Sequence, residues 1–260
     1  MNIVVLVKQV PDTESERKLV AGSGTLDRAA ADGVINELDE FAIEEGLRIA
    51  EAHGGEVTIL SVGPARAGES IRKALSMGAD KAVHVLDEAI AGSDALVTSA
   101  VIAAALGRVG FDLVIAGAES TDARTGVVPA MLAERLGVPQ LTQASQVEVS
   151  GSEVRVRRMS DDGYDVVAAS LPAVVSVLEK INEPRYPSFK GIMAAKKKPL
   201  ETLSLSDLGV DAGDVGLSVA WTEVEQTTAR PPREAGEIVK DAEGSGAKAL
   251  ADFLATQKFI

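Results

Sequence analysis

The 260-residue chain contains no cysteine, so it has no disulfide, no thiol nucleophile and no cysteine ligands for zinc or an iron–sulfur cluster. Its only imidazoles are His53 and His84, and a lone histidine in a layered domain is usually structural. Because these absences remove most routes to enzymatic chemistry, we expect no catalytic residue, no metal site and no bond chemistry performed by the chain itself.

The chain also lacks the positive charge that general nucleic-acid binding requires, since its formal net charge is −13. No apolar run reaches the roughly 18 residues that a membrane helix needs. The first residues lack the charged-then-apolar layout of a secretion signal. We therefore expect a cytoplasmic protein that is not embedded in a membrane and does not bind nucleic acid.

Aromatic residues are scarce, at 3% of the chain, but Val, Leu, Ile and Ala are abundant and can form a large core. Buried strand patterns alternate with amphipathic helix patterns through the first half of the sequence. The predicted strands are 2–7, 56–62, 81–86 and 112–116, and the predicted helices start near Asn36, Ala67, Ser93 and Pro129. This alternation predicts βαβ units and a doubly wound, mostly parallel, Rossmann-like α/β sheet.

The pattern changes after residue 138. Residues 146–149, 154–158 and 165–169 alternate apolar and polar residues, as half-exposed antiparallel strands do, and residues 174–177 form one more buried strand. From residue 199 onward glycines and acids are frequent, until a last amphipathic helix near residues 247–256. We therefore expect an α/β domain with an added antiparallel portion over 1–199. An arm over 200–260 then packs either on that domain or on another chain.

Loop 117–128 joins a predicted buried strand to the first turn of a helix, where unused backbone N–H groups favour an anion such as phosphate. Ser120, Thr121 and Thr125 add hydroxyls to this loop, and Arg124 adds a positive charge. The chain lacks both G-x-x-x-x-G-K-[ST] and a G-x-G-x-x-G after the first strand, which disfavours a Walker nucleotidase and a standard NAD-dependent dehydrogenase. A phosphate-binding loop and an ordinary strand–helix loop both fit this pattern.

Residues 182–198 form a basic segment in an acidic chain. Phe189, Ile192 and Met193 have the spacing that places them on one face of a short helix, and Tyr186 precedes them. From composition alone, a solvated loop with a charged helix end and a docking loop with an apolar anchor fit equally well.

Three stretches together resemble the β subunit of electron transfer flavoproteins. The sequence N-E-P-R-Y-P-S-F-K-G-I-M-A-A-K-K-K (182–198) resembles the signature of that family. I-R-K-A-L-S-M-G-A-D-K-A (71–82) resembles its second helix and third strand, and V-K-Q-V-P-D with I-N-E-L-D-E-F-A-I-E-E-G resembles its N-terminal part. The resemblance runs from Asn2 to about Val210, and residues 211–260 fit the family's C-terminal arm in position and length.

This resemblance implies a heterodimer with an α subunit that holds most of a shared FAD, and a structural AMP in the β subunit. It implies electron transfer from flavin dehydrogenases of the acyl-CoA type, as in fatty acid oxidation, to a membrane quinone reductase or a similar acceptor. The positions that match the family's AMP contacts are Leu6, Asn36, Glu37, Leu38, Asp39, Val62, Gly117, Ala118, Glu119, Ser120, Thr121, Asp122, Ala123, Arg124, Thr125, Gly126, Val127 and Val128.

The resemblance further implies that Thr13 and Leu38 contact the flavin and that the apolar residue at the position of Phe189 inserts into a dehydrogenase. The positions that match the family's partner-recognition loop are Asn182, Glu183, Pro184, Arg185, Tyr186, Phe189, Ile192, Met193, Lys196, Lys197 and Lys198. In the family, this loop recognises dehydrogenases.

Two alternatives stay open. The family's phosphate loop is often richer in Gln, Asp and Asn than G-A-E-S-T-D-A-R-T-G-V-V, which leaves room for a bifurcating-type subunit with a second FAD in place of AMP. Backbone donors tolerate the change, because an N–H group does not depend on side-chain identity. The other alternative is a stand-alone adenine-nucleotide-binding module, which predicts a monomer or homodimer without flavin.

Overall fold

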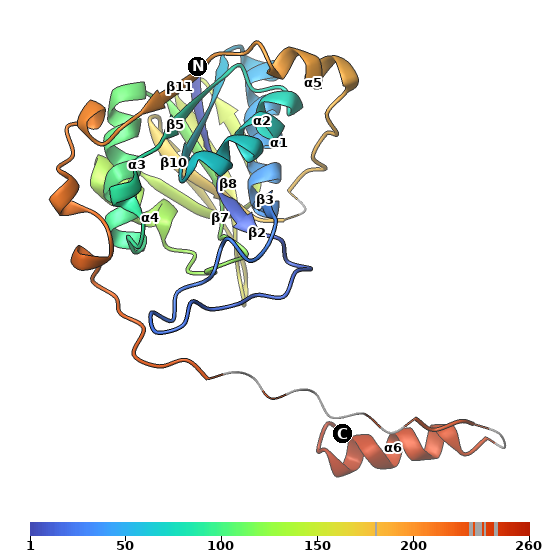
Figure 1. The fold of residues 1–260 in the computed structure, drawn as a ribbon. Coiled ribbons are helices and arrows are strands. Elements are labelled where there is room, and N and C mark those ends of the chain that lie inside the picture. Colours follow the sequence, from blue (N-terminus) through green and yellow to red (C-terminus); the bar gives the residue numbers. More distant parts are fainter. Residues whose placement is uncertain (180, 229–230, 232–235, 237, 242–243) are drawn as a thin grey trace. The chain divides into compact units, whose positions relative to one another are not determined.

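The computed structural model describes residues 1–179, 181–228, 231, 236, 238–241 and 244–260. The chain forms two compact units, Met1–Glu225 and Gln226–Ile260. Within the described residues, the first unit contains a nine-stranded sheet with the strand order β11-β5-β4-β1-β6-β10-β7-β8-β9 (Figure 1). Neighbouring strands are parallel from β11 to β7, and β8 and β9 extend one edge as antiparallel strands. The doubly wound, mostly parallel sheet with an antiparallel addition is thus confirmed.

The strands of this sheet are β1 (Asn2–Leu6), β4 (Glu56–Val62), β5 (Lys81–Val85), β6 (Leu113–Gly117), β7 (Gln140–Ser150), β8 (Glu153–Ser160), β9 (Gly163–Ser170), β10 (Ala173–Val177) and β11 (Leu200–Leu203). A separate antiparallel pair consists of β2 (Gln9–Pro11) and β3 (Gly33–Ile35). Short 3-10 helices span Ala65–Ala67, Glu88–Ile90, Ser206–Leu208, Ala212–Asp214 and Leu217–Val219.

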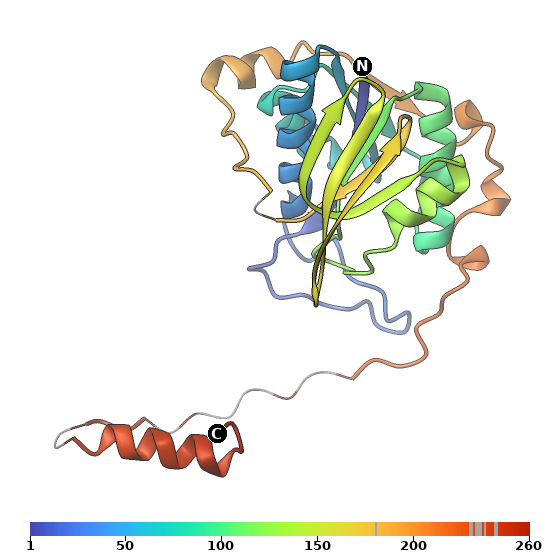
Figure 2. The same cartoon turned by 180° about the vertical axis from the view of Figure 1, so that it is seen from behind.

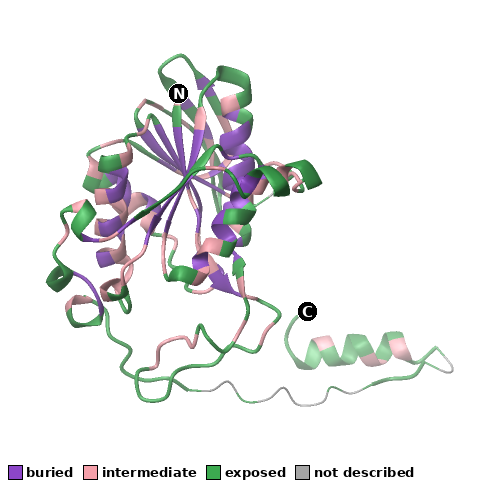
Figure 3. Cartoon of the chain, turned by 45° about the horizontal axis from the view of Figure 1, so that its top comes forward, coloured by how far each residue is buried: buried purple, intermediate pink, exposed green. Residues whose placement is uncertain are grey.

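Helices cover both faces of the sheet, because successive side chains of a strand point to opposite faces. On β1, Ile3 and Val5 pack into the core beneath α1 (Glu37–His53) and α2 (Gly68–Met77). Val4 packs into the opposite core, which includes residues of α3 (Ala95–Val109) and α4 (Val128–Leu136). Figure 2 shows these two helices on the other side of the sheet from α1 and α2. The central strands are consequently buried on both sides (Figure 3).

Several local features differ from the sequence pattern. Residues 9–11, which follow the predicted strand 2–7, form β2 because they pair with β3 at the far end of the excursion 12–32. The cap of α3 is Asp94 rather than Ser93, since the Asp94 carboxylate accepts a hydrogen bond from the Val97 N–H at 2.9 Å. Glu44 and Glu45 of α1 are buried despite their charge, because residues 182–185 pass over them.

The chain does not loosen at residue 199. After α5 (Phe189–Ala195), β11 pairs in parallel with β5, and Leu203, Leu205 and Val215 enter the core beside α3. The compact first unit therefore continues to Glu225, whereas the sequence predicted that an arm begins at residue 200. The second unit contains α6 (Gly246–Thr256), on which Leu250 and Phe253 are exposed, and part of the expected arm lies outside the described residues.

Candidate functional site

The expected nucleotide residues gather where three neighbouring parallel strands end. β1, β4 and β6 are adjacent in the sheet and end at Leu6, Val62 and Gly117. In open α/β sheets this carboxyl edge is where ligands bind. The fold thus brings residues 6, 36–39, 62 and 117–128 to one edge of the sheet.

Asn36 fastens the start of α1 to the loop 117–128. It occupies the N-cap position that the sequence predicted, but its side chain makes no capping bond within α1. Instead its Nδ2 donates to the Glu119 carbonyl at 3.0 Å, and its Oδ1 accepts from the Thr121 N–H at 3.0 Å. Asn36 is only 1% exposed, so these bonds satisfy a buried amide and fix the loop's first turn.

Asp39 lies buried at the centre of the same site. Its carboxylate accepts from the Lys8 N–H at 2.8 Å and from Asn36 Nδ2 at 2.9 Å. Burial raises the pKa of Asp39 to about 7, against the lowering effect of these two hydrogen bonds. A Cβ on Gly117 would lie 2.7 Å from the Asp39 Oδ1 and 2.8 Å from the Leu38 Cβ, so only glycine allows β6 to approach α1 this closely.

Asp122 carries the second buried carboxylate of the site, with a side chain only 1% exposed. Lys8 Nζ approaches it at 2.9 Å, and Arg28 Nη2 approaches it at 2.6 Å. Burial raises the pKa of Asp122, but Lys8, Ser120 and Arg28 outweigh that effect and hold the pKa well below its usual range. Sequence reasoning missed both cations. Lys8 could have been found from its place just after β1, whereas Arg28 carries no local signal.

The rest of the loop offers unused polar groups. No side chain caps the first turn of α4, and Pro129 is the second residue of this helix. Thr121 Oγ1 is buried, and within the described residues it has no hydrogen-bond partner. Arg124 and Gly126 adopt positive φ angles of 50° and 64°, which turn the loop toward α4. Backbone donors with a free hydroxyl suit a phosphate group.

Half-buried apolar side chains from Leu6, Leu38 and Val62 lie at the same edge and suit a purine ring. The donor set therefore fits an adenine mononucleotide. Ala123, Arg124, Thr125 and Val127 are exposed at the outer rim of the loop. Thr13 and Glu37 are also exposed, and Thr13 lies in the excursion 12–32.

The basic segment 182–198 presents its apolar side chains to solvent. Tyr186 is 95% exposed and Phe189 is 81% exposed, and Ile192 and Met193 are about half exposed on α5. Ser188 caps α5 by accepting from the Gly191 N–H at 3.0 Å. The predicted short helix with an exposed apolar face is thereby present.

Three residues expected to recognise a partner instead hold this segment on the domain. Arg185 donates to Glu44 at 2.7 and 3.0 Å and to Glu51 at 2.6 and 3.2 Å, and these bonds raise its pKa. Asn182 Nδ2 donates to the Phe41 carbonyl and to Glu45, both at 3.0 Å. At the other end, Lys198 Nζ donates to the carbonyl oxygens of residues 75, 78 and 79 around the C-terminus of α2.

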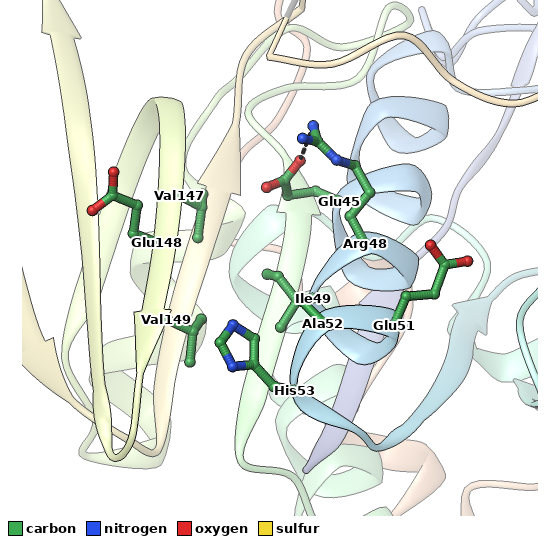
Figure 4. A pocket seen from close by; sticks show the side chains of 9 residues that line it. All are labelled: Glu45, Arg48, Ile49, Glu51, Ala52, His53, Val147, Glu148 and Val149. Atoms are coloured by element: carbon green, nitrogen blue, oxygen red, sulfur yellow. Dashed lines mark hydrogen bonds and ion pairs between the residues drawn. The ribbon is translucent and has the colours of Figure 1, made fainter.

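A hollow of about 580 Å³ lies elsewhere, between the C-terminal half of α1 and β7 (Figure 4). It is lined by Glu45, Arg48, Ile49, Glu51, Ala52, His53, Val147, Glu148 and Val149. None of the residues expected at the nucleotide site lines it, so it is separate from the strand-end site. Among the described residues, no helix is both long and apolar enough to cross a bilayer.

The electron transfer flavoprotein domain matches residues 23–208. The electron transfer flavoprotein subunit beta of Mycobacterium tuberculosis is 53% identical over 265 residues, covering 100% of this chain and 99% of the relative. The protein of that name from Clostridium acetobutylicum is 38% identical over 239 residues (92% of each chain), and that from Bacillus subtilis is 35% identical over 258 residues (99% and 98%). The chain therefore belongs to the electron transfer flavoprotein family, as one of its β subunits.

Proposed function

We propose that the chain is a cytoplasmic protein that pairs with an α subunit. The pair carries electrons from flavin dehydrogenases of the acyl-CoA type, in fatty acid oxidation, to a membrane quinone reductase or a similar acceptor. FAD, held mostly by the α subunit, supplies the redox chemistry when bound. This chain contributes binding, orientation and docking. Its relatives from Mycobacterium tuberculosis, Clostridium acetobutylicum and Bacillus subtilis are named as β subunits, which supports the pairing.

The strand-end site holds AMP as a structural ligand. Backbone N–H groups of residues 125–128 and the Thr121 hydroxyl take the phosphate, and the apolar side chains of Leu6, Leu38 and Val62 hold the adenine. The bridge from Asn36 to the Glu119 carbonyl and the Thr121 N–H supports this role, because it sets the loop before any ligand arrives. Thr13 and Leu38 lie on the flavin side.

One observation supports the proposed docking of dehydrogenases. The segment 182–198 is attached to the domain at both ends and exposes the side chains of Tyr186, Phe189, Ile192 and Met193. An exposed aromatic that inserts into a partner's pocket acts as an anchor, and the surrounding lysines steer an acidic partner. A carrier must leave each partner quickly, so this interface is small and short-lived. The arm places the exposed Leu250 and Phe253 of α6 against the α subunit.

The bound nucleotides test the pairing and the AMP site. The chain is co-expressed with an α subunit from the same organism, and the nucleotides of the purified complex are identified by mass. We expect one FAD and one AMP per pair. Two FAD would favour the bifurcating type, and absence of both a stable pair and flavin would overturn the proposal in favour of a stand-alone nucleotide module.

Phe189→Ala tests the docking role. We expect kcat/KM for electron transfer from a dehydrogenase to fall by about tenfold or more, because a buried aromatic anchor is lost from the interface. FAD and AMP contents should stay unchanged. Val166→Ala, which trims another exposed apolar side chain on β9, is the control and should leave the rate unchanged. Loss of cofactor in Phe189→Ala would instead show that the segment is structural.

A further inference from the structure

Two cations from separate parts of the chain meet on one buried carboxylate beside the loop 117–128. Lys8 lies two residues after the end of β1, and Arg28 belongs to the excursion 12–32 between β2 and β3. Lys8 Nζ lies 2.9 Å and Arg28 Nη2 lies 2.6 Å from Asp122 Oδ2. The Asp122 side chain is 1% exposed, whereas the Lys8 and Arg28 side chains remain 42% and 46% exposed.

The charge at this cluster exceeds what Asp122 requires. Lys8 and Arg28 bring two positive charges against the one negative charge of Asp122, and buried Asp39, whose pKa is raised to about 7, supplies only part of a second negative charge near neutral pH, in a chain whose net charge is −13. Lys8 Nζ also reaches Ser120 Oγ at 3.3 Å, which extends the cluster along the loop. The uncapped first turn of α4 adds the positive end of a helix dipole at the end of the same loop.

Arg28 is placed there by contacts that do not depend on its own side chain. Arg66, after β4, donates from Nη1 to the Arg28 carbonyl at 2.6 Å and from Nη2 to the Ala31 carbonyl at 3.1 Å. Its Nε donates to Gln9 Oε1 at 3.0 Å. Because these bonds hold the backbone of the excursion, the guanidinium of Arg28 is not needed to fasten it. A role in binding therefore explains its position better than a role as a latch.

We propose that Lys8 and Arg28 bind the phosphate of the nucleotide, and that Asp122 is a positioning residue that holds both cations beside the loop. The ligand class is a nucleoside monophosphate, whose dianionic end matches two half-exposed cations. The inference rests on the proposed nucleotide function and deepens it. It makes the excursion 12–32 a wall of the nucleotide site, contributed by a segment distant in sequence from the loop.

The test compares AMP with adenosine, which lacks the phosphate. The heterodimer is freed of nucleotide by dialysis with charcoal, and the affinity for each probe is measured by equilibrium dialysis. Lys8→Gln and Arg28→Gln should each weaken AMP binding by ~10- to 100-fold, the range of a charge-assisted hydrogen bond, and leave adenosine binding unchanged. Arg28→Lys should recover part of the AMP affinity, because it restores the charge without the planar fork.

Lys18→Gln is the matched control, because it removes one positive charge from the same excursion. Lys18 lies 3.7 Å from Glu16 in an exposed pair, so both affinities should stay at the wild-type values. Equal loss of AMP and adenosine binding in Arg28→Gln, or no loss of either, would overturn the inference. A wild-type heterodimer that binds neither AMP nor adenosine would overturn the proposed nucleotide function itself, which is a separate outcome.

The role of Asp122 is tested by coupling. In an Asp122→Asn background, Arg28→Gln should weaken AMP binding at least threefold less than it does in the wild type, because the guanidinium is no longer held in place. The adenosine affinity should show no such coupling. Full additivity of the two changes for AMP would show that Asp122 does not position Arg28.

Discussion

The clamp between Arg185 and α1 gives the most quantitative prediction. Arg185→Ala removes two side-chain hydrogen bonds to Glu44 and two to Glu51. The Glu44 side chain is 8% exposed, so its carboxylate is left without its cation. The backbone N–H of residue 185, at 3.1 Å from Glu44 Oε2, is kept by alanine and retains part of the compensation.

The free energy follows from these exposures. Breaking a fully buried ion pair costs ~3–5 kcal/mol, and exposed pairs contribute ~0–1 kcal/mol. Since 35% of the Arg185 side chain is exposed and Glu51 is largely in solvent, we expect a cost of about 2 kcal/mol for opening the segment. That energy corresponds to a roughly 30-fold change in the opening equilibrium.

Hydrogen–deuterium exchange of the heterodimer measures this local opening directly. Amides of residues 183–191 should exchange about 30-fold faster in Arg185→Ala, and those of the central strands should not change. Arg155→Ala is the control, because Arg155 pairs with Glu153 at 3.2 Å, both side chains are more than half exposed, and the change should have little effect. The reasoning is refuted if exchange in the segment stays at the wild-type rate.

Three further predictions concern the proposed nucleotide site and α5. Because burial raises the pKa of Asp39 to about 7, the native state binds a proton that the unfolded state has released. The free energy of unfolding should therefore fall by up to about 4 kcal/mol between pH 4 and pH 7. Urea denaturation at a series of pH values measures this fall, which should be absent in Asp39→Asn. Asn36→Ala leaves the buried Thr121 N–H without its acceptor and should cost about 2 kcal/mol, with AMP lost on gel filtration. Gly191→Ala places a Cβ 2.5 Å from a carbonyl oxygen of α2, so it should destabilise the complex by about 1–3 kcal/mol in thermal denaturation.

Local patterns predicted the sheet well, because strands buried on both faces are continuous apolar runs and their helices have clear start and stop residues. Val4 and Val5 needed no tertiary knowledge to be assigned to a buried strand. Topology then predicted which strand ends meet, and this was enough to bring Asn36 together with the loop 117–128.

Partners distant in sequence could not be predicted in this way. Glu44 carries the charge of a surface residue, and only the passage of Arg185 across α1, 141 residues later, explains its burial. Lys198 was expected to face a partner, but its ammonium group fills the open C-terminus of α2. The strand β11 is only four residues long and follows the basic run 196–198, so its pairing depends on the free edge of β5 rather than on its own pattern.

The order of the strands gives the segment 182–198 a mechanical property. β10 and β11 lie five positions apart in the sheet, which is about 24 Å at the usual spacing between strands. The connecting residues 178–199 have ample slack for this span, but the attachments at Asn182, Arg185 and Lys198 divide it into short lengths. The exposed apolar side chains of Tyr186, Phe189, Ile192 and Met193 fall between residues 186 and 197, where α5 packs against α2 and Ala195 is buried in the core. A dehydrogenase that docks there as proposed would meet a segment whose ends are already fixed, so little chain entropy would be lost on contact.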